Sequence, residues 1–413
     1  MLALPDDGCG RNLRSVEARL DEAEGLAGAI GIDVVGRQAF RLRSAKPATL
    51  FGKGQAEGIA ELVAEKEAGL LIVDAALSPV QQKSLEEITK AKVIDRTGLI
   101  LEIFGERAAT AEGRLQVELA HLDYQAGRLV RSWTHLERQR GGFGFLGGPG
   151  ETQIEADRRL IRDRMAKIRR ELEQVKRTRG LHRGRRQRAP WPVVALVGYT
   201  NAGKSTLFNR MTRASVMADD LLFATLDPTL REISLPGFDK AILSDTVGFV
   251  SDLPTELVAA FSATLEEVLA ADLILHVRDM AHPDSDAQAA DVETVLENLG
   301  IKADSPPRIE VWNKIDALAA AEREALLNEV GRHQEAAAIS ALTGEGVDRL
   351  REAISERLRA GSEIHRLTLP AGEGERLAWL HSRGEVLESQ IDGDMMQLAV
   401  RLSPDNWARF QAL

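Results

Sequence analysis

The chain has 413 residues, 44% of them hydrophobic, and a net charge of −10, so it is too apolar for a disordered protein and is expected to form two to four domains. No apolar stretch approaches the roughly 18 residues needed to cross a bilayer, and residues 2–4 are too short for the core of a signal peptide, so we expect a cytoplasmic protein without a transmembrane segment. The single cysteine, Cys9, excludes an internal disulfide and argues against a zinc site.

An N-terminal α/β domain is expected over residues 11–110. Apolar runs predict strands at Leu70–Asp74 and Lys92–Asp95. Helical patterns predict helices at Ser78–Thr89 and Gly98–Phe104. Strands separated by helices imply a small parallel sheet.

A long antiparallel helical hairpin with two hydrophobic seams is predicted over residues 111–180. Apolar residues recur there in steps of four and three, the spacing of one helix face. The first seam comprises Leu115, Leu119, Leu122, Ala126, Leu129, Trp133 and Leu136. The second seam comprises Ile154, Ile161, Met165, Ile168, Leu172 and Val175. Two such helices, each on the order of 35 Å long at 1.5 Å per residue, should pair side by side.

The connection between the two helices, residues 141–150, contains six glycines in ten. A flexible link is one interpretation. Phe143, Phe145 and Leu146 favour another, because a simple linker would leave these apolar side chains exposed. Glycine lets a backbone approach its partner closely, and aromatic rings stack on unpaired bases, so we expect this glycine-rich tip to contact folded RNA.

Basic residues predominate from Glu155 to Pro190, with 14 Lys/Arg against 5 Asp/Glu. A solvated helix face is the alternative, but a sustained excess of one sign on an acidic chain favours contact with a phosphate backbone. We expect this partner to be RNA and expect no DNA partner. Residues 181–192 are expected to form a mobile basic linker to the next domain.

A glycine-rich sequence of the form G-x-x-x-x-G-K-S follows a short apolar strand at Val193–Val197. This spacing is typical of a phosphate-binding loop ahead of a helix, whose first backbone N–H groups point at a bound anion. An ordinary glycine-rich turn is the alternative. Lys204 would reach the β- and γ-phosphates, and the Ser205 hydroxyl would hold Mg²⁺. The residues expected to contact the nucleotide here are Gly198, Tyr199, Thr200, Asn201, Ala202, Gly203, Lys204, Ser205 and Thr206.

Residues 223–229 have the pattern of a first nucleotide-dependent switch. We expect Phe223, Ala224 and Thr225 to lie near the nucleotide. The Thr225 hydroxyl is predicted to complete the Mg²⁺ coordination, with Thr229 as the alternative. Such segments order around the γ-phosphate and Mg²⁺ and relax after hydrolysis.

Asp245–Gly248, which closes an apolar strand at residues 241–244, has the pattern of a second switch. Asp245 would orient Mg²⁺ through water, and the Gly248 N–H would sense the γ-phosphate. A surface turn is the alternative. The three predicted magnesium residues are therefore Ser205, Thr225 and Asp245.

Asn313, Lys314 and Asp316 form an N-K-x-D sequence after another apolar strand. This sequence suits guanine, because the Asp316 carboxylate can accept from both N1–H and N2–H₂, which adenine cannot supply together. Ser340 and Ala341, after a strand ending at residue 339, would offer a backbone N–H to guanine O6. The order of these motifs along the chain indicates GTP and GDP as ligands.

Phe249 occupies the position where many GTPases carry the glutamine that aligns the attacking water. An apolar ring cannot polarise water, so intrinsic hydrolysis should be slow and should depend on groups supplied from elsewhere. Asn201 is a candidate to coordinate K⁺ against the phosphates, and stabilisation of the loop turn is its alternative role. The residues expected to take part in hydrolysis are Asn201, Lys204, Thr225 and Gly248.

Strands and helices alternate over residues 193–361, which predicts a doubly wound α/β sheet with nucleotide at the strand C-termini. A helix is expected at residues 255–270 between the second switch and the next strand. Residues 363–413 predict a small α+β domain with a helix near residues 373–383 followed by two strands around a turn at Asp392–Gly393.

The chain resembles the HflX family of ribosome-associated GTPases, within the translation-factor-related class of P-loop GTPases. The resemblance covers nearly the whole chain from about residue 11 and is most specific at residues 141–159, 223–229 and 245–249. It implies binding to the large ribosomal subunit near the peptidyl-transferase region. GTP-dependent splitting of stalled or stress-damaged ribosomes is attributed to some members and is expected here by resemblance.

Two functional hypotheses stay open. The first is a GTPase acting on ribosomes, monomeric and cytoplasmic, with peripheral membrane association an open point. The second is an RNA chaperone or helicase whose N-terminal half uses ATP, as reported for some family members, with the GTPase domain as regulator. Phe51–Gly54 could bind an anion, but a plain helix start is the favoured interpretation, and no second phosphate loop is present.

Overall fold

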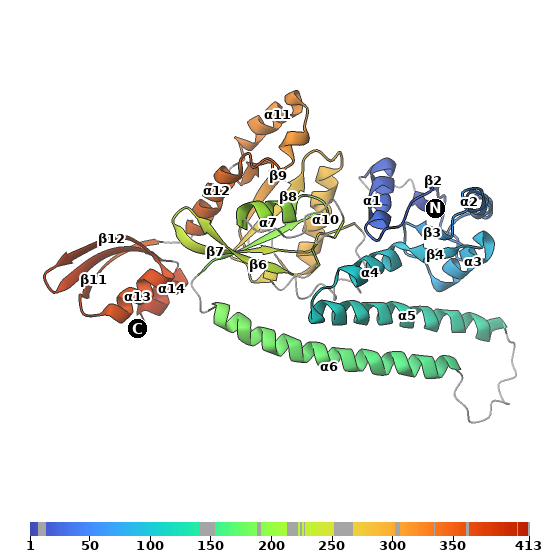
Figure 1. Cartoon of the computed structure of the whole chain (residues 1–413), viewed down its shortest axis with the longest axis horizontal. Helices are drawn as coiled ribbons and strands as arrows, with labels where there is room; N and C mark the ends of the chain where they lie inside the picture. Colours follow the sequence, from blue (N-terminus) through green and yellow to red (C-terminus); the bar gives the residue numbers. More distant parts are fainter. Residues whose placement is uncertain are drawn as a thin grey trace.

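The computed structural model contains three separate β-sheets, which belong to an N-terminal, a central and a C-terminal domain (Figure 1). The central domain lies between the other two, and two long helices run alongside the N-terminal and central domains (Figure 1). The structure describes residues 1–6, 14–139, 153–187, 191–212, 222–223, 225–226, 228–251, 267–301, 306–333, 335–360, 363–402 and 404–411.

The N-terminal sheet has four parallel strands in the order β2-β1-β3-β4. Its strands are β1 (Leu2–Asp6), β2 (Arg37–Arg41), β3 (Leu70–Val73) and β4 (Lys92–Asp95). The two strands predicted from the sequence are confirmed as β3 and β4. The expected domain start at residue 11 is too late, because β1 lies inside the sheet, with Leu2 and Leu4 fully buried. Cys9 lies outside the described residues.

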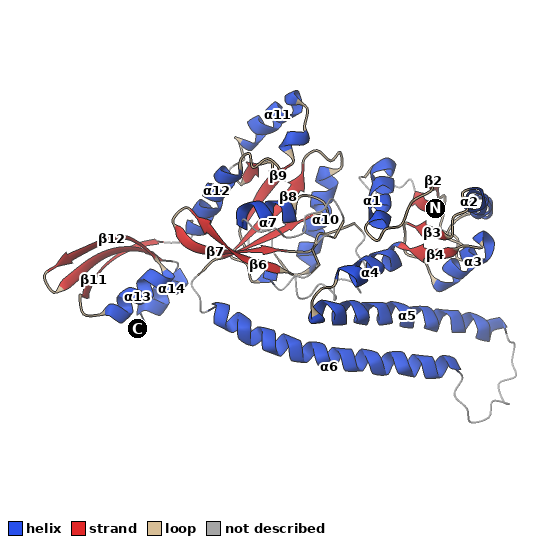
Figure 2. Cartoon of the chain, viewed as in Figure 1, coloured by secondary structure: helices blue, strands red, loops and turns tan. Residues whose placement is uncertain are grey.

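Helices cover both faces of this sheet (Figure 2). They are α1 (Val16–Gly28), α2 (Lys53–Glu65), α3 (Pro79–Thr89) and α4 (Arg96–Arg107). The predicted N-cap Ser78 is confirmed, since its hydroxyl accepts from the Gln81 N–H while the Gln81 side chain accepts from the Ser78 N–H. The Gly52 N–H is similarly bound by the Gln55 side chain at 2.9 Å, as expected for a plain helix start.

The helix α4 carries apolar side chains on most of its surface, and neighbouring elements cover them. Leu99, Ile100, Leu101, Ile103 and Phe104 are all buried. These residues share one hydrophobic cluster with the central domain, so the N-terminal and central domains are joined by a continuous core.

The two long helices pair as predicted. They are α5 (Ala111–Gln139) and α6 (Gln153–Gln187). Met165, Ile168 and Leu172 of the second seam are buried. The described part of the first seam is half-buried, and a second face of α5, including Val117 and Ala120, packs into the core shared with α4. The glycine-rich tip lies outside the described residues.

The linker expected at residues 181–192 is wrong over its first part, because α6 continues to Gln187. Residues 181–187 are helical, so α6 is a 35-residue helix and spans about 52 Å at 1.5 Å per residue, longer than predicted. Residues 188–190 lie outside the described part. Among the described residues, no helix combines the length and apolarity needed to cross a bilayer.

The central sheet has six strands in the order β10-β9-β8-β5-β7-β6, and only β6 runs antiparallel to its neighbour. Its strands are β5 (Val193–Gly198), β6 (Thr229–Leu235), β7 (Phe238–Asp245), β8 (Leu273–Asp279), β9 (Arg308–Asn313) and β10 (Ala336–Ala338). Its helices are α7 (Lys204–Thr212), α10 (Ser285–Asn298), α11 (Ala320–Val330), α12 (Val347–Arg359) and the 3₁₀ turn η1 (Ile315–Ala317). This arrangement confirms the predicted doubly wound fold. Most of the helix expected at residues 255–270 lies outside the described residues.

The C-terminal domain has a three-stranded antiparallel sheet in the order β11-β13-β12. Its elements are β11 (Glu363–Pro370), α13 (Gly374–Arg383), β12 (Glu385–Asp392), β13 (Met395–Leu402) and α14 (Pro404–Gln411). The predicted helix and two strands correspond to α13, β12 and β13. The strand β11 and the helix α14 were not predicted. Both helices pack on one face of the sheet around Leu380, Val400 and Phe410.

Candidate nucleotide-binding site

The phosphate loop connects the end of β5 to the start of α7, at the C-terminal edge of the central sheet. Gly198 and Gly203 have φ angles of +152° and +93°, which other residues rarely adopt. A Cβ atom would lie 2.2 Å from the Val277 carbonyl oxygen at Gly198 and 2.2 Å from Asn313 Nδ2 at Gly203. Only glycine fits these two positions, so the loop can follow the narrow path that a bound phosphate requires.

Lys204, the first residue of α7, is buried beneath the loop. Its ammonium group donates to the carbonyl oxygens of Gly198 at 3.0 Å and Tyr199 at 2.7 Å. Burial lowers the pKa of Lys204 to about 8, although Asp245 acts in the opposite direction. A phosphate placed in the loop would supply the negative charge that this buried cation lacks.

The side-chain oxygens of three residues meet beside the loop. Ser205 Oγ lies 2.9 Å from Thr225 Oγ1 and donates to Asp245 Oδ2 at 2.8 Å, and Thr225 Oγ1 donates to the same carboxylate oxygen at 2.8 Å. Burial raises the pKa of Asp245, and the bonds from Ser205 and Thr225 and the charge of Lys204 oppose it. The other carboxylate oxygen, Asp245 Oδ1, is buried and has no hydrogen-bond partner among the described residues.

These oxygens fit a hard divalent cation. Carboxylate and hydroxyl oxygens are the protein ligands that Mg²⁺ takes in phosphate sites, where it keeps several water molecules. The structure brings together the three residues predicted to hold it, and it places Thr225 rather than Thr229 there. Thr229 instead starts β6, opposite Asp245 in the sheet register. Ala224 lies outside the described residues.

The segment predicted as the second switch follows β7 and lies against the phosphate loop. Phe249 donates its N–H to the Gly198 carbonyl at 3.1 Å and accepts at its own carbonyl from the Thr200 N–H at 2.7 Å. A Cβ atom at Gly248 would lie 2.8 Å from Thr200 Cγ2 and 3.1 Å from Lys204 Nζ. Gly248 therefore faces the phosphate side of the loop, whereas the Phe249 ring is buried in the hydrophobic core.

Asn313 braces the two halves of the site. Its Nδ2 donates to the Ala202 carbonyl at 2.8 Å, and its Oδ1 accepts from the Ala341 N–H at 2.9 Å. Arg210 of α7 holds the same far loop through the carbonyl oxygens of Ala341 and Leu342. Asn313 is thus positioned to orient the phosphate loop and the base-binding loop rather than to read the base itself.

The residues predicted to read the base lie after β9 and β10. Lys314, in the left-handed region with φ +64°, forms an ion pair with Asp279 at 2.8 Å, and the Asp316 side chain is exposed. The Ser340 and Ala341 N–H groups donate to Glu345 and Asn313 within the chain. The guanine O6 contact expected from these two residues stays a prediction and requires these bonds to rearrange.

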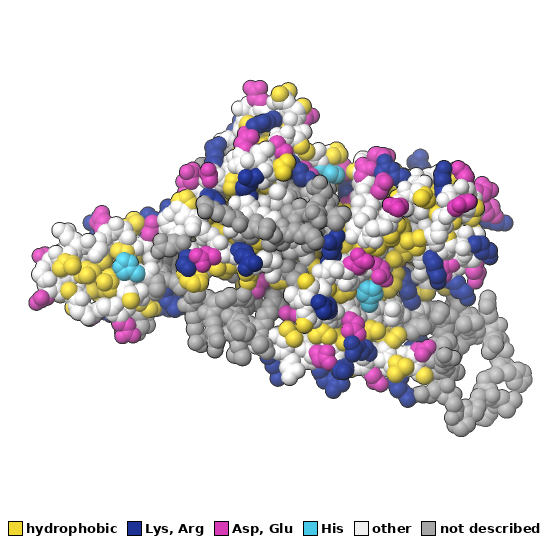
Figure 3. Space-filling view, viewed as in Figure 1, with side chains coloured by type: hydrophobic (Ala, Val, Ile, Leu, Met, Phe, Trp, Pro, Cys, Tyr) yellow, Lys and Arg dark blue, Asp and Glu magenta, His cyan; other side chains and the backbone are white. Residues whose placement is uncertain are grey.

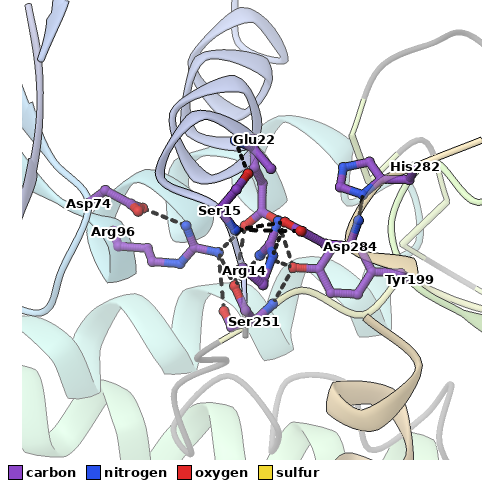
Figure 4. A network of polar contacts seen from close by, with 10 residues as sticks. Arg14, Ser15, Glu22, Asp74, Arg96, Tyr199, Ser251, His282 and Asp284 are labelled. Carbon is purple, nitrogen blue, oxygen red and sulfur yellow. Dashed lines mark hydrogen bonds and ion pairs between the residues drawn. The ribbon is translucent and has the colours of Figure 1, made fainter. Parts of the chain in front are cut away.

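Sequence reasoning missed a group of polar residues that touches the phosphate loop from the N-terminal domain. Arg14, Glu22 and Arg96 surround the Tyr199 hydroxyl and Ser251 (Figure 4). No local pattern could have indicated them, because Glu22 and Tyr199 are 177 positions apart and Arg14 and Ser251 are 237 apart.

Four family models match the chain in order. They are described as the GTP-binding GTPase N-terminal region at residues 17–105, the GTP-binding GTPase middle region at 107–186, the 50S ribosome-binding GTPase at 193–314 and the HflX C-terminal domain at 325–411. A protein named GTPase HflX from Magnetococcus marinus is 50% identical over 392 residues, which cover 95% of this chain and 90% of that protein. The chain belongs to the HflX family of GTPases.

A second HflX relative, from Escherichia coli, is 45% identical and covers 94% of this chain and 91% of its own length. A solved GTP-binding protein from Sulfolobus solfataricus in complex with GDP is 23% identical, with a TM-score of 0.45 over 87% of this chain and 98% of that one. Membership of the HflX family identifies the chain as an enzyme that binds and hydrolyses GTP and carries a GTPase domain of the ribosome-binding class. The expected family and enzyme activity are confirmed.

Proposed function

We propose that the chain is a GTP-dependent factor that binds the large ribosomal subunit and splits or rescues stalled ribosomes under stress, with hydrolysis stimulated by the ribosome. The observation that carries this proposal is the match of residues 193–314 to the 50S ribosome-binding GTPase model, over the segment in which Ser205, Thr225 and Asp245 converge. A stimulated switch also fits the burial of Phe249, which leaves this position without a water-aligning side chain.

The nucleotide site is proposed to work with the residues described above. The phosphate loop and Lys204 would hold the phosphates, Asp316 would accept from guanine, and the Gly248 N–H would contact the γ-phosphate. Mg²⁺, held by Ser205, Thr225 and Asp245, would neutralise charge on the β- and γ-phosphates. Thr225, which already lies beside Ser205 and Asp245, would complete the metal coordination when the γ-phosphate is bound.

Asn201 is proposed to bind K⁺ beside the phosphates. It has a φ of +60° and its side chain is exposed within the loop, so its amide oxygen is accessible. A monovalent cation there would supply positive charge in place of an arginine finger. Faster turnover in potassium than in sodium is expected, and equal rates would remove this role for Asn201.

The long helix α6 supports contact with ribosomal RNA. Its side chains at Arg159, Arg162, Lys167 and Arg169 are exposed. Arg164 forms an ion pair with Glu118 of α5 at 2.6 Å. This arginine therefore contributes to the pairing of the two helices and is less available to RNA. Acidic and basic side chains are interspersed elsewhere over the face drawn in Figure 3, which makes the basic sequence of α6 a local feature of an acidic molecule.

Sedimentation with ribosomal particles tests the proposal. The full chain should pellet with large subunits in the presence of a non-hydrolysable GTP analogue and remain mostly in the supernatant with GDP. Small subunits provide the control and should not retain the protein in either state. Equal retention with both nucleotides, or with both subunits, would contradict a GTP-dependent large-subunit factor.

A further inference from the structure

The Tyr199 hydroxyl is the point at which the N-terminal domain meets the phosphate loop. It donates to Glu22 Oε2 at 2.6 Å and accepts from Arg14 Nη1 at 2.9 Å and from the Ser251 N–H at 2.8 Å. A phenol has one proton and two lone pairs, so these three bonds satisfy it completely. We call this contact, made by Arg14, Glu22, Tyr199 and Ser251, the Tyr199 joint (Figure 4).

Further charged residues, Arg96 and Asp74, stabilise the Tyr199 joint through Glu22 and Ser251. Arg96, at the start of α4, donates to the Ser251 carbonyl at 3.1 Å and pairs with Glu22 and Asp74. Burial opposes ionisation of Glu22, but Arg96 and Arg14 outweigh it and lower the pKa of Glu22 to about 2. The carboxylate is therefore charged at neutral pH, and removing a buried partner from such a group is costly.

The joint connects the N-terminal domain to both phosphate-binding segments at once. Tyr199 follows Gly198 in the phosphate loop, and its own carbonyl accepts from Lys204. Ser251 lies three residues after Gly248 in the second switch. A shift of Ser251 would move Gly248, whose backbone is packed against Thr200 and Lys204 with no space for a Cβ atom.

An independent apolar contact reaches the first switch. The Phe223 ring packs edge-to-face on Phe104 of α4, with ring centroids 4.8 Å apart. Leu222 lies against Gly25 of α1, where a Cβ atom would be 3.2 Å from Leu222 Cδ1. Both side chains are buried, and Thr225 follows two residues after Phe223. The N-terminal domain therefore holds both switch segments, one by polar and one by apolar contacts.

We infer that the N-terminal domain positions both switches for the γ-phosphate through the Tyr199 joint, and so favours GTP over GDP. With the domain docked, Thr225 already lies beside Ser205 and Asp245, and Gly248 already lies beside Lys204. GDP has no γ-phosphate to contact these groups, so only GTP gains from their being held in place. The inference rests on the nucleotide site proposed above, and Tyr199 acts in it as a positioning residue.

The test compares two tyrosine variants of the full chain. Tyr199→Phe keeps the ring and removes the hydroxyl, and Tyr124→Phe is the matched control. Tyr124, the other tyrosine of the chain, is half-buried where Tyr199 is buried, and it donates to Asp95 at 2.5 Å, but within the N-terminal domain and its helical pair. Affinities for a non-hydrolysable GTP analogue and for GDP are measured for each protein. Tyr199→Phe should weaken the analogue about fivefold to tenfold, as for loss of a buried hydrogen bond, and leave GDP within about twofold.

A second variant keeps the test decisive if Tyr199→Phe folds poorly. Ser251→Ala retains the N–H to Tyr199 but removes an Oγ that accepts from Arg14 at 2.9 Å and Arg96 at 3.2 Å, so it should shift the same ratio less strongly. If the ratio of the affinities for the GTP analogue and for GDP were unchanged in both variants, or if both affinities fell equally, the inference about the Tyr199 joint would be wrong. If the unaltered chain bound neither nucleotide, the proposed site itself would be wrong instead.

Discussion

Single residues of the phosphate loop are constrained by their neighbours in space. A side chain at Gly203 would collide with the Asn313 amide, and a side chain at Gly248 would collide with Thr200. In each pair the glycine is required by a residue that is distant in the sequence. Asn313 then joins the loop at Ala202 to the base-binding loop at Ala341. A substitution at Gly203 or Asn313 would therefore disturb the connection between the phosphate loop and the predicted base-binding loop.

Nucleotide affinity should fall with rising pH because of Lys204. Burial lowers its pKa to about 8, so the cation predominates at pH 7 and is progressively lost as the pH rises through 8. A bound phosphate favours the charged form and raises that pKa, so binding takes up a proton in this window. The GDP dissociation constant is expected to rise about tenfold between pH 7 and pH 9.

Fluorescent-nucleotide titrations across that range provide the measurement. Lys204→Ala should bind GDP far more weakly at every pH and show no such dependence. A pH-independent affinity in the unaltered chain, or tight binding by Lys204→Ala, would refute the assignment of this lysine to the phosphates.

Asp316→Asn should change the preferred base. The amide can no longer accept two hydrogen bonds from guanine, but it can donate to the O2 of xanthine. The variant is expected to lose GTP affinity by a factor of 10 or more and to gain affinity for xanthosine triphosphate. Competition binding with both nucleotides measures this exchange, and an unchanged preference for GTP would remove Asp316 from the base site.

Apart from Thr225, the residues of the nucleotide site could be predicted because each of their motifs lies at the end of a buried strand. Motifs predicted Ser205 and Asp245, and the spacing from Asp245 within the first-switch pattern predicted Thr225; the structure brings the three oxygens within 2.9 Å of one another. The donor to guanine O6 was not settled this way. Such a bond depends on which N–H groups are already engaged, and a sequence does not specify that.

At the scale of whole elements, local signals located helices with clear ends and strands with fully apolar runs. Ser78 marked the start of α3, and the apolar run of β3 marked a strand covered on both faces. The strands β1 and β11 were missed for different reasons. β1 lies at the very start of the chain without a preceding turn, and most of β11 is exposed, so its pattern carries little hydrophobic signal.

The stability of the α5–α6 pair should depend on the buried residues of its seam and not on the exposed ones. Ile168 is fully buried and Leu160, on the same helix, is 67% exposed. Ile168→Ala is expected to destabilise the pair by about 2–4 kcal/mol, and Leu160→Ala by less than about 0.5 kcal/mol. Amide hydrogen exchange in α5 and α6 measures this locally, which suits a chain of several domains. Equal effects of the two variants would contradict the predicted seam.

On the scale of the molecule, the N-terminal and central domains share one hydrophobic cluster, while the C-terminal domain has a cluster of its own. This division could not be derived from the sequence, because the contacts that join Phe104 to Phe223 and Glu22 to Tyr199 depend on how complete domains pack. The long helical pair lies alongside this joined unit (Figure 1), and α5 packs against α4, whose Phe104 contacts Phe223.

The glycine-rich tip is predicted to matter for activation and not for nucleotide binding. Removing Gly142–Gly148, outside the described residues, should leave GDP affinity within about twofold because the deletion removes none of the predicted nucleotide-binding residues. The same variant should lose the stimulation of GTP turnover by large ribosomal subunits. A deletion variant that is still stimulated fully would show that residues 141–150 only connect the helices.

GTP turnover by the purified full chain, measured with and without large ribosomal subunits, tests the central claim most directly. Because Phe249 supplies no water-aligning group, we expect slow turnover by the chain alone and at least a tenfold rise when large subunits are added. Fast turnover without ribosomal particles, together with no response to them, would contradict a ribosome-stimulated GTPase.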